Sequence, residues 1–147
     1  SCVDASGYVW KGLRIMGLGG SIRYNNREDS FQYTEREMRR RAHKLEHQAH
    51  KKGGIDLLLT HAPAKGLNDG DDCAHRGFAC FNEILDEYQP KWFIHGHIHL
   101  NYDAKLPRVC TRGNTTVINA TERYVFEIPD PDPEIRNRPF WKKWFGV

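Results

Sequence analysis

Residues 91–99 read Lys-Trp-Phe-Ile-His-Gly-His-Ile-His, a short apolar run that passes directly into three alternating histidines. An apolar run of this length predicts a strand that is buried on both faces. Alternate residues of an extended chain share a side, so His97 and His99 can converge while Ile98 points into the core. Gly96 has no side chain and lets the backbone come close to a bound ion or anion. The stretch therefore predicts a buried strand with a ligand site at its carboxyl end.

A second histidine follows a second apolar strand. Residues 55–59 (Ile-Asp-Leu-Leu-Leu) come after a glycine pair and lead into residues 60–63 (Thr-His-Ala-Pro). Ligands of parallel α/β sheets collect outside the carboxyl ends of the strands, so we expect His61 and the later histidines to face one crevice. Imidazole is a good ligand for Zn, Mn, Fe or Ni. The joint pattern favours a metal site over histidines that only satisfy local hydrogen bonds.

Two amphipathic helices are expected between the strands. The first begins with a capping box at residues 34–37 (Thr-Glu-Arg-Glu) and ends at the glycine pair 53–54. The second covers about residues 77–88 and is stopped by Pro90. Their apolar faces consist of Met38, Ala42, Leu45 and Ala49 in the first helix, and of Phe78, Phe81, Leu85 and Tyr88 in the second.

The remaining strands complete an α/β order. Residues 8–18 predict one or two strands broken at Gly12, and residues 115–119 and 123–128 predict a closing antiparallel pair. The order of strand, strand, helix, strand, helix and three further strands indicates an α/β fold. Its parallel strands would be central, with antiparallel strands at an edge.

The histidine segments resemble the calcineurin-like metallophosphoesterase superfamily. The resemblance is carried by residues 60–63, by an acidic loop that ends His-Arg-Gly at 75–77, and by Gly-His-Ile-His at 96–99. Residues 14–21 resemble the segment that follows the third motif of that family. The resemblance extends over residues 7–128.

This resemblance implies a phosphoesterase with two divalent metal ions, Mn, Zn or Fe. The family fold is a sandwich of two central sheets flanked by helices, and the chain would be its C-terminal half. In the family, a metal-bound hydroxide attacks the phosphorus of a phosphomonoester or phosphodiester in line with the leaving group. Carried over by position, His61 and His97 would bind one ion and His99 the other.

Three motifs of the family, D-x-H, G-D-x-x-D and G-N-H, are absent from the sequence. Residues 4–6 (Asp-Ala-Ser) and 113–115 (Gly-Asn-Thr) lack the histidine that two of these motifs require. Without anionic ligands, three imidazoles offset the repulsion between two cations poorly. We therefore expect a fragment that is inactive alone, with its catalytic residues unknown. A missing N-terminal half or a partner chain would complete the site.

The loop at residues 69–76 combines aspartates with His75 and Arg76. Over the same strand ends, Arg76 would meet a phosphate oxygen of the substrate and His75 would relay a proton. The alternative is a solvated acidic loop in which Arg76 pairs with a neighbouring aspartate.

The first helix contains a competing motif, His-x-x-Glu-His at residues 43–47, which is typical of zinc peptidases, with Glu122 as a distant third ligand. A helical wheel places His43 and His47 opposite the apolar stripe, toward solvent, which argues against an inward-facing metal site. The same outer face is rich in Arg and Lys. Glutamates dilute that charge and i,i+4 pairs explain it, so nucleic-acid binding is not indicated. The main alternative function is a non-catalytic interaction module that keeps the fold without the metal site.

Composition agrees with one cytoplasmic domain. The chain has 147 residues, 39% of them hydrophobic, and a formal net charge of +3, which is too mild to imply nucleic acid or membrane as a partner. No apolar run is long enough for a membrane span and no signal segment opens the chain. Four unpatterned cysteines argue against a disulfide framework. We expect a partial metallophosphoesterase domain at 1–128 and a tail at 129–147 that is Pro-rich and then aromatic and basic.

Overall fold

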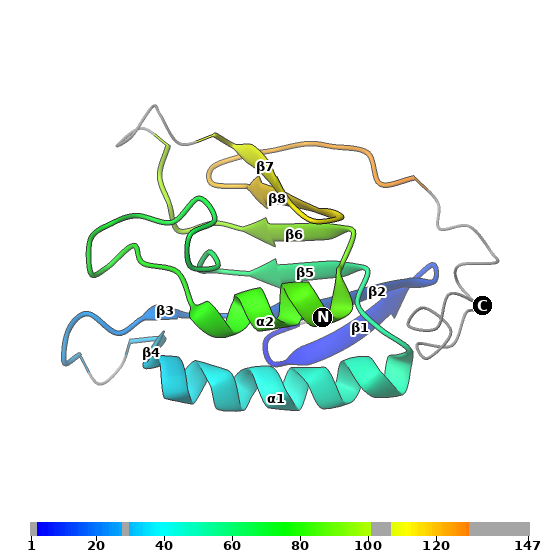
Figure 1. Cartoon of the computed structure of the whole chain (residues 1–147), viewed down its shortest axis with the longest axis horizontal. Helices are drawn as coiled ribbons and strands as arrows, with labels where there is room; N and C mark the ends of the chain where they lie inside the picture. Colours follow the sequence, from blue (N-terminus) through cyan, green and yellow to red (C-terminus); the bar gives the residue numbers. More distant parts are fainter. Residues whose placement is uncertain (1–2, 28–29, 101–106, 130–147) are drawn as a thin grey trace.

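The computed structural model describes residues 3–27, 30–100 and 107–129 (Figure 1). The strands are β1 (Ser6–Trp10), β2 (Leu13–Leu18), β3 (Ser21–Ile22), β4 (Gln32–Tyr33), β5 (Leu57–Thr60), β6 (Trp92–His95), β7 (Val109–Arg112) and β8 (Thr115–Asn119), and the helices are α1 (Glu35–Lys52) and α2 (Ala79–Tyr88). The expected tail lies outside the described residues from residue 130 onward, so the proposed domain boundary stays a prediction.

One large sheet organises the fold. Its six strands follow the order β1-β2-β5-β6-β8-β7, and β3 and β4 form a separate two-stranded sheet. The four central strands are parallel, and β1 and β7 pair antiparallel at the two edges. The α/β prediction with parallel strands in the centre is therefore confirmed, with an antiparallel strand at each edge. The second large sheet that the resemblance implies is not formed within the described ranges.

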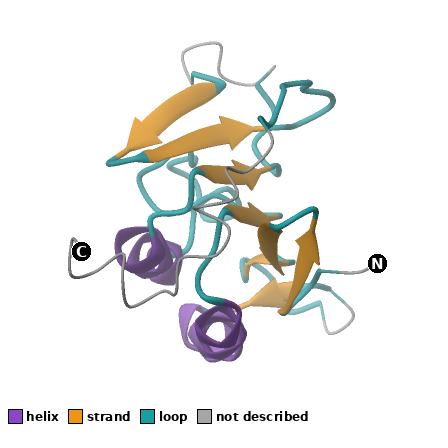
Figure 2. Ribbon diagram, turned by 90° about the vertical axis from the view of Figure 1, so that its right-hand side faces the viewer, coloured by secondary structure: helices purple, strands orange, loops and turns teal. Residues whose placement is uncertain are grey.

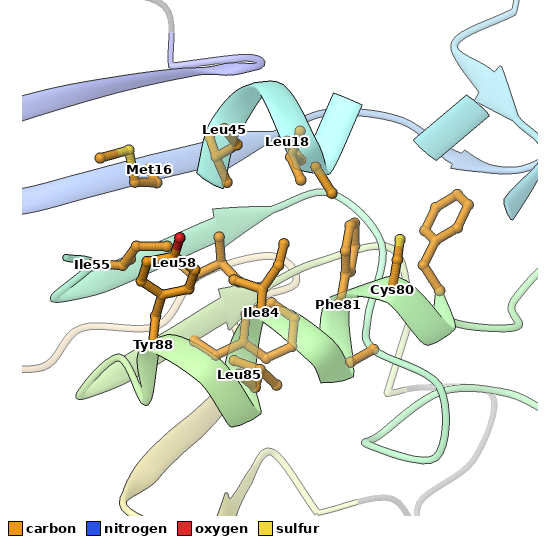
Figure 3. Close-up of a cluster of buried hydrophobic side chains, with 14 of the residues drawn as sticks. Met16, Leu18, Leu45, Ile55, Leu58, Cys80, Phe81, Ile84, Leu85 and Tyr88 are labelled. Atoms are coloured by element: carbon orange, nitrogen blue, oxygen red, sulfur yellow. The ribbon is translucent and has the colours of Figure 1, made fainter. Parts of the chain in front are cut away.

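Both helices cover the same face of this sheet (Figure 2). Figure 3 shows side chains from β2, α1 and α2 meeting in one cluster, with Leu58 of β5 among them. The predicted apolar stripe of α1 is the set of residues that α1 buries: Met38, Ala42, Leu45 and Ala49. This packing fixes which side chains of each strand face inward, because neighbouring residues of a strand point to opposite faces.

The local signals of α1 work as predicted. The Thr34 hydroxyl accepts the backbone N–H of Glu37 at 3.2 Å, and the Glu37 carboxylate accepts the Thr34 N–H at 2.7 Å. The helix ends at Gly53, whose φ of 79° lies in the left-handed region that glycine adopts without a Cβ clash. An ion pair just beyond this end ties α1 to the sheet, since Asp56 accepts two hydrogen bonds from the Arg14 guanidinium at 2.7 and 2.6 Å.

The start of α2 depends on the other helix. Phe78 occupies the N-cap position and makes no side-chain cap. The Glu35 carboxylate, in the first turn of α1, accepts the backbone N–H groups of Ala79 at 3.1 Å and Cys80 at 2.7 Å instead. A carboxylate at this place satisfies two free donors and complements the positive end of the helix dipole. Glu35 therefore fixes α2 relative to α1.

The predicted strand at 123–128 is wrong. Strand β8 pairs antiparallel with β7, which precedes it in sequence, and residues 123–128 join no ladder. Their alternation has another cause: Phe126 and Ile128 pack on the face of the sheet that the helices leave open. An alternation of apolar and polar residues predicts an extended segment with one side packed on a core. It does not show that the segment pairs with another strand.

The helix-free face of the sheet is only partly covered. Its buried cluster consists of Leu13, Leu57, Trp92 and Ile118. Beside this cluster Tyr8 is 45% exposed and Trp10 is 51% exposed. Neither helix of the described part is long and apolar enough to cross a membrane.

We predict that Glu35→Ala lowers the free energy of unfolding by about 1–2 kcal/mol, because two amide donors of α2 lose their acceptor. Glu35→Gln keeps one acceptor oxygen and should cost less. Urea unfolding followed by circular dichroism measures both, with Glu127→Ala on an exposed position as the control. Equal stability of Glu35→Ala and the control would contradict the proposed cap.

Candidate functional site

The two histidine segments meet at one edge of the sheet. Strands β5 and β6 run parallel with Leu59 opposite Ile94, so their carboxyl ends lie side by side. In Figure 1 the arrowheads of β5, β6 and β8 point to the same edge of the sheet. Just beyond the strands, the Gly96 N–H donates to the His61 carbonyl at 3.0 Å. The structure therefore brings these two segments together at one edge of the sheet.

The imidazoles of His61 and His97 are in direct contact. Nε2 of His61 lies 3.1 Å from Nδ1 of His97, and the ring centroids are 4.8 Å apart. Nε2 of His97 lies 2.9 Å from the carbonyl oxygen of Ala74. A carbonyl only accepts, so this nitrogen carries the proton and Nδ1 presents its lone pair to His61. The tautomer of His97 is thus set by a loop residue that lies between the two strands in sequence.

This pair fits the geometry of two ligands on one metal ion. Two imidazole nitrogens that each lie about 2.0–2.1 Å from a zinc ion, at an angle of about 90–110°, are about 2.8–3.4 Å apart. The observed separation of 3.1 Å falls in that range. The His97 hydrogen bond to Ala74 also has the form expected of a metal-binding histidine, which donates its other ring N–H to a carbonyl or carboxylate.

The surroundings of His61 favour its neutral form. Burial lowers the pKa of His61, and the neighbouring His97 ring lowers it further. A metal ligand must be unprotonated, so a lowered pKa reduces competition from protons for the same lone pair.

The loop at 69–76 contacts the same place. The ring of His75 lies 5.2 Å from the ring of His97, and its Nδ1 is 2.7 Å from the Asp72 carboxylate. The hydrogen bond from His75 lowers the pKa of Asp72. Asp69 accepts the backbone N–H groups of Gly66 and Gly77 at 2.9 and 3.0 Å.

The loop also carries the cationic side chain of Arg76. Asp72 and Asp69 are occupied by other donors, and among the described residues Arg76 has no ion-pair partner. The alternative in which Arg76 pairs with a neighbouring aspartate therefore does not occur in this structure. Its guanidinium is available to an anion.

His99 is not joined to the pair. Its side chain is exposed, whereas the side chain of the preceding Ile98 is buried. Within the described ranges no three His, Cys, Asp or Glu side chains gather closely enough to hold a metal ion. His61 and His97 are therefore brought together, and metal binding by His61, His97 and His99 stays a prediction.

The zinc-peptidase pattern on α1 faces solvent. His43 and His47 are exposed, and Nδ1 of His43 lies 2.9 Å from the Glu46 carboxylate. Their position on the outer side of the helix agrees with the helical wheel.

The sequence did not lead us to predict that the His95 side chain is buried. It is 1% exposed, and its Nδ1 donates to the Gly96 carbonyl at 3.0 Å. Its Nε2 has no hydrogen-bond partner in the described part of the chain. Burial lowers the pKa of His95 to about 4. The signal was present in the sequence, since His95 follows Phe93 by two residues and shares its inward face.

Comparison with known proteins finds relatives over part of the chain. Metallophosphoesterase domain-containing protein 1 of human and that of mouse are each 32% identical to it over 71 residues, which cover 46% of this chain and 20% of the relative. No family model matches the chain. The chain thus spans about a fifth of the curated relatives that it matches.

Solved structures share the fold. One crystal structure matches with a TM-score of 0.57 and 20% identity, over 82% of this chain and 45% of the other. TT1561 of Thermus thermophilus matches with a TM-score of 0.56 and 13% identity, over 81% of this chain and 48% of the other. At these identities the likeness concerns the fold alone.

The buried His95 predicts a pH dependence of stability. Its folded-state pKa of about 4 lies below the ordinary value of 6.5, so between these values the unfolded chain binds a proton that the folded chain does not. Stability should therefore fall by about 3 kcal/mol as the pH drops from 6.5 to 4. His95→Leu should flatten this fall in urea unfolding of the metal-free chain, and His47→Leu on the exposed helix face should not. An unchanged slope in His95→Leu would contradict the assignment.

Proposed function

We propose that this chain is the C-terminal part of a metal-dependent phosphoesterase of the calcineurin-like metallophosphoesterase superfamily. Its partial similarity to a metallophosphoesterase domain-containing protein supports the proposal. The reaction is hydrolysis of a phosphomonoester or phosphodiester. The observation that carries the proposal is the His61–His97 pair, whose facing nitrogens are 3.1 Å apart at the carboxyl ends of two parallel strands. The proposed site is incomplete in this chain, which is inactive alone.

In this proposal His61 and His97 hold one divalent ion and His99 belongs to a second, the ions being Mn, Zn or Fe. When bound, such ions offset the charge of the phosphoryl oxygens and lower the pKa of the attacking water. The chain contributes imidazoles, and a hydrogen bond to Ala74 fixes the orientation of the His97 ring. Further ligands, including carboxylates, come from outside this chain, from a missing N-terminal half or a partner chain.

Arg76 and His75 bind the substrate. The guanidinium is unpaired among the described residues and offers several N–H donors in the fork geometry that matches phosphate oxygens. His75 is held by Asp72 beside His97, where its ring can hydrogen-bond a phosphoryl oxygen or pass a proton to the leaving group.

We also propose a cytoplasmic location. It is supported by Cys73, Cys80 and Cys110, which are free thiols in the structure.

The first test is zinc and manganese binding by the 147-residue chain, measured by isothermal titration calorimetry. We expect one weakly held ion, and loss of at least about ten-fold in affinity for His61→Ala and His97→Ala, because each removes one of two ligands. His47→Ala, on the exposed face of α1, is the matched control and should bind as the unaltered chain does.

The second test is hydrolysis. A protein in which this chain is joined to upstream D-x-H and G-D-x-x-D motifs should hydrolyse p-nitrophenyl phosphate or its bis ester with Mn or Zn present. Arg76→Gln should raise KM by about ten-fold or more, as expected when a charged hydrogen-bond donor to phosphate is lost, whereas Arg40→Gln on the exposed helix face should not. A joined protein that is folded, metal-loaded and inert toward a broad panel of phosphoesters would contradict the proposed hydrolase function.

A further inference from the structure

The turn that carries His97 has an unusual backbone. His97 has a φ of 66°, and the Ile98 N–H donates to the Gly96 carbonyl at 2.7 Å. A three-residue turn closed by this bond, with a positive φ at its central residue, is the strained form of the γ-turn and is rare. A histidine in this region costs free energy, so the turn persists only if its surroundings hold it.

Two side chains of the β8 end hold the exit of the turn. The Ile98 carbonyl accepts Nδ2 of Asn119 at 2.8 Å and Oγ1 of Thr121 at 2.9 Å. Asn119 is 0% exposed, and its Oδ1 accepts the Thr121 N–H at 3.0 Å, which fixes the direction of the amide. The Arg108 guanidinium in turn donates to the carbonyls of Asn119 and Thr121 at 3.1 and 3.2 Å.

The residues that lead into the turn are also fixed by hydrogen bonds. The Gly96 N–H donates to the His61 carbonyl at 3.0 Å, and the Gly96 carbonyl also accepts Nδ1 of His95 at 3.0 Å. The Ala120 N–H donates to the His95 carbonyl at 2.7 Å. Since both ends are fixed, the Cα–Cβ direction of His97 is fixed as well, and the imidazole lies against His61.

We propose that Asn119 and Thr121 are positioning residues that hold the γ-turn in its strained form and thereby keep the His97 ring against His61. The inference rests on the proposed function, because the aligned pair serves to bind a metal ion. If the clamp on the Ile98 carbonyl is removed, φ of His97 can relax to negative values. Cβ then swings, and the contact between Nδ1 of His97 and Nε2 of His61 is lost.

Thr121 offers the sharper test, because Asn119→Ala leaves buried polar groups unpaired and can unfold the chain. Thr121→Val has the same shape and lacks the hydroxyl donor, and Thr121→Ser keeps the donor. Ile118→Val in β8 is a control that weakens packing on the other face of the sheet without touching the turn.

Two measurements on the full 147-residue chain decide the matter. In the metal-free chain, nitrogen-15 NMR of the imidazoles should show a protected Nε2–H on His97, which is lost in Thr121→Val and kept in Thr121→Ser and Ile118→Val. With zinc alone as the probe, calorimetry should show about ten-fold weaker binding for Thr121→Val and an affinity within about two-fold for the other two variants.

The possible results separate the two proposals. If Thr121→Val leaves both the protection of the His97 Nε2–H and the zinc affinity unchanged, the proposed clamp is wrong. It is also wrong if Thr121→Val and Ile118→Val lose protection and affinity equally, because lowered stability would then explain both losses. If the unaltered chain binds no zinc while the NMR difference is present, the proposed function fails and the clamp on the His97 turn stands.

Discussion

Parallel pairing of β5, β6 and β8 is the constraint on which the site depends. Parallel strands end at the same edge, so the residues that follow them arrive together although they are far apart in sequence. His61 follows β5, His97 follows β6, and Asn119 closes β8 opposite His95. If β6 shifted its register by one residue, the side chain of His95 would point out of the core and that of a neighbouring residue would point into it. The packing of α1 and α2 on the inner face therefore fixes the site as well as the core.

The chemistry of the site follows from which of its polar groups already have hydrogen-bond partners. The hydrogen bonds of the 69–76 loop involve Asp69 and Asp72, orient His75 and leave the Arg76 guanidinium unpaired within the described residues. Burial and the neighbouring His97 ring lower the pKa of His61. The two facing imidazoles and the Arg76 guanidinium are the groups that the proposed site uses for a metal ion and an anionic oxygen.

The sequence predicted features whose cause is local. The capping box at Thr34 and the boundaries of β8 follow from neighbouring residues and appear as expected. Strand β7 was missed because it is an edge strand without apolar alternation. The Glu35 cap of α2 joins groups 44 and 45 residues apart, and the bond from Asn119 to the Ile98 carbonyl spans 21 residues. Such contacts exist only once the sheet has formed, so no local sequence pattern predicts them.

Paramagnetic broadening by Mn²⁺ tests the central claim most directly, that His61 and His97 together bind a metal ion. Imidazole NMR signals of the 147-residue chain would be followed while Mn²⁺ is added in small steps. Our account predicts that the signals of His61 and His97 broaden first and in parallel, while those of His43 and His47 on the outer face of α1 persist. Earlier broadening of the α1 histidines, or equal broadening of all rings, would contradict it.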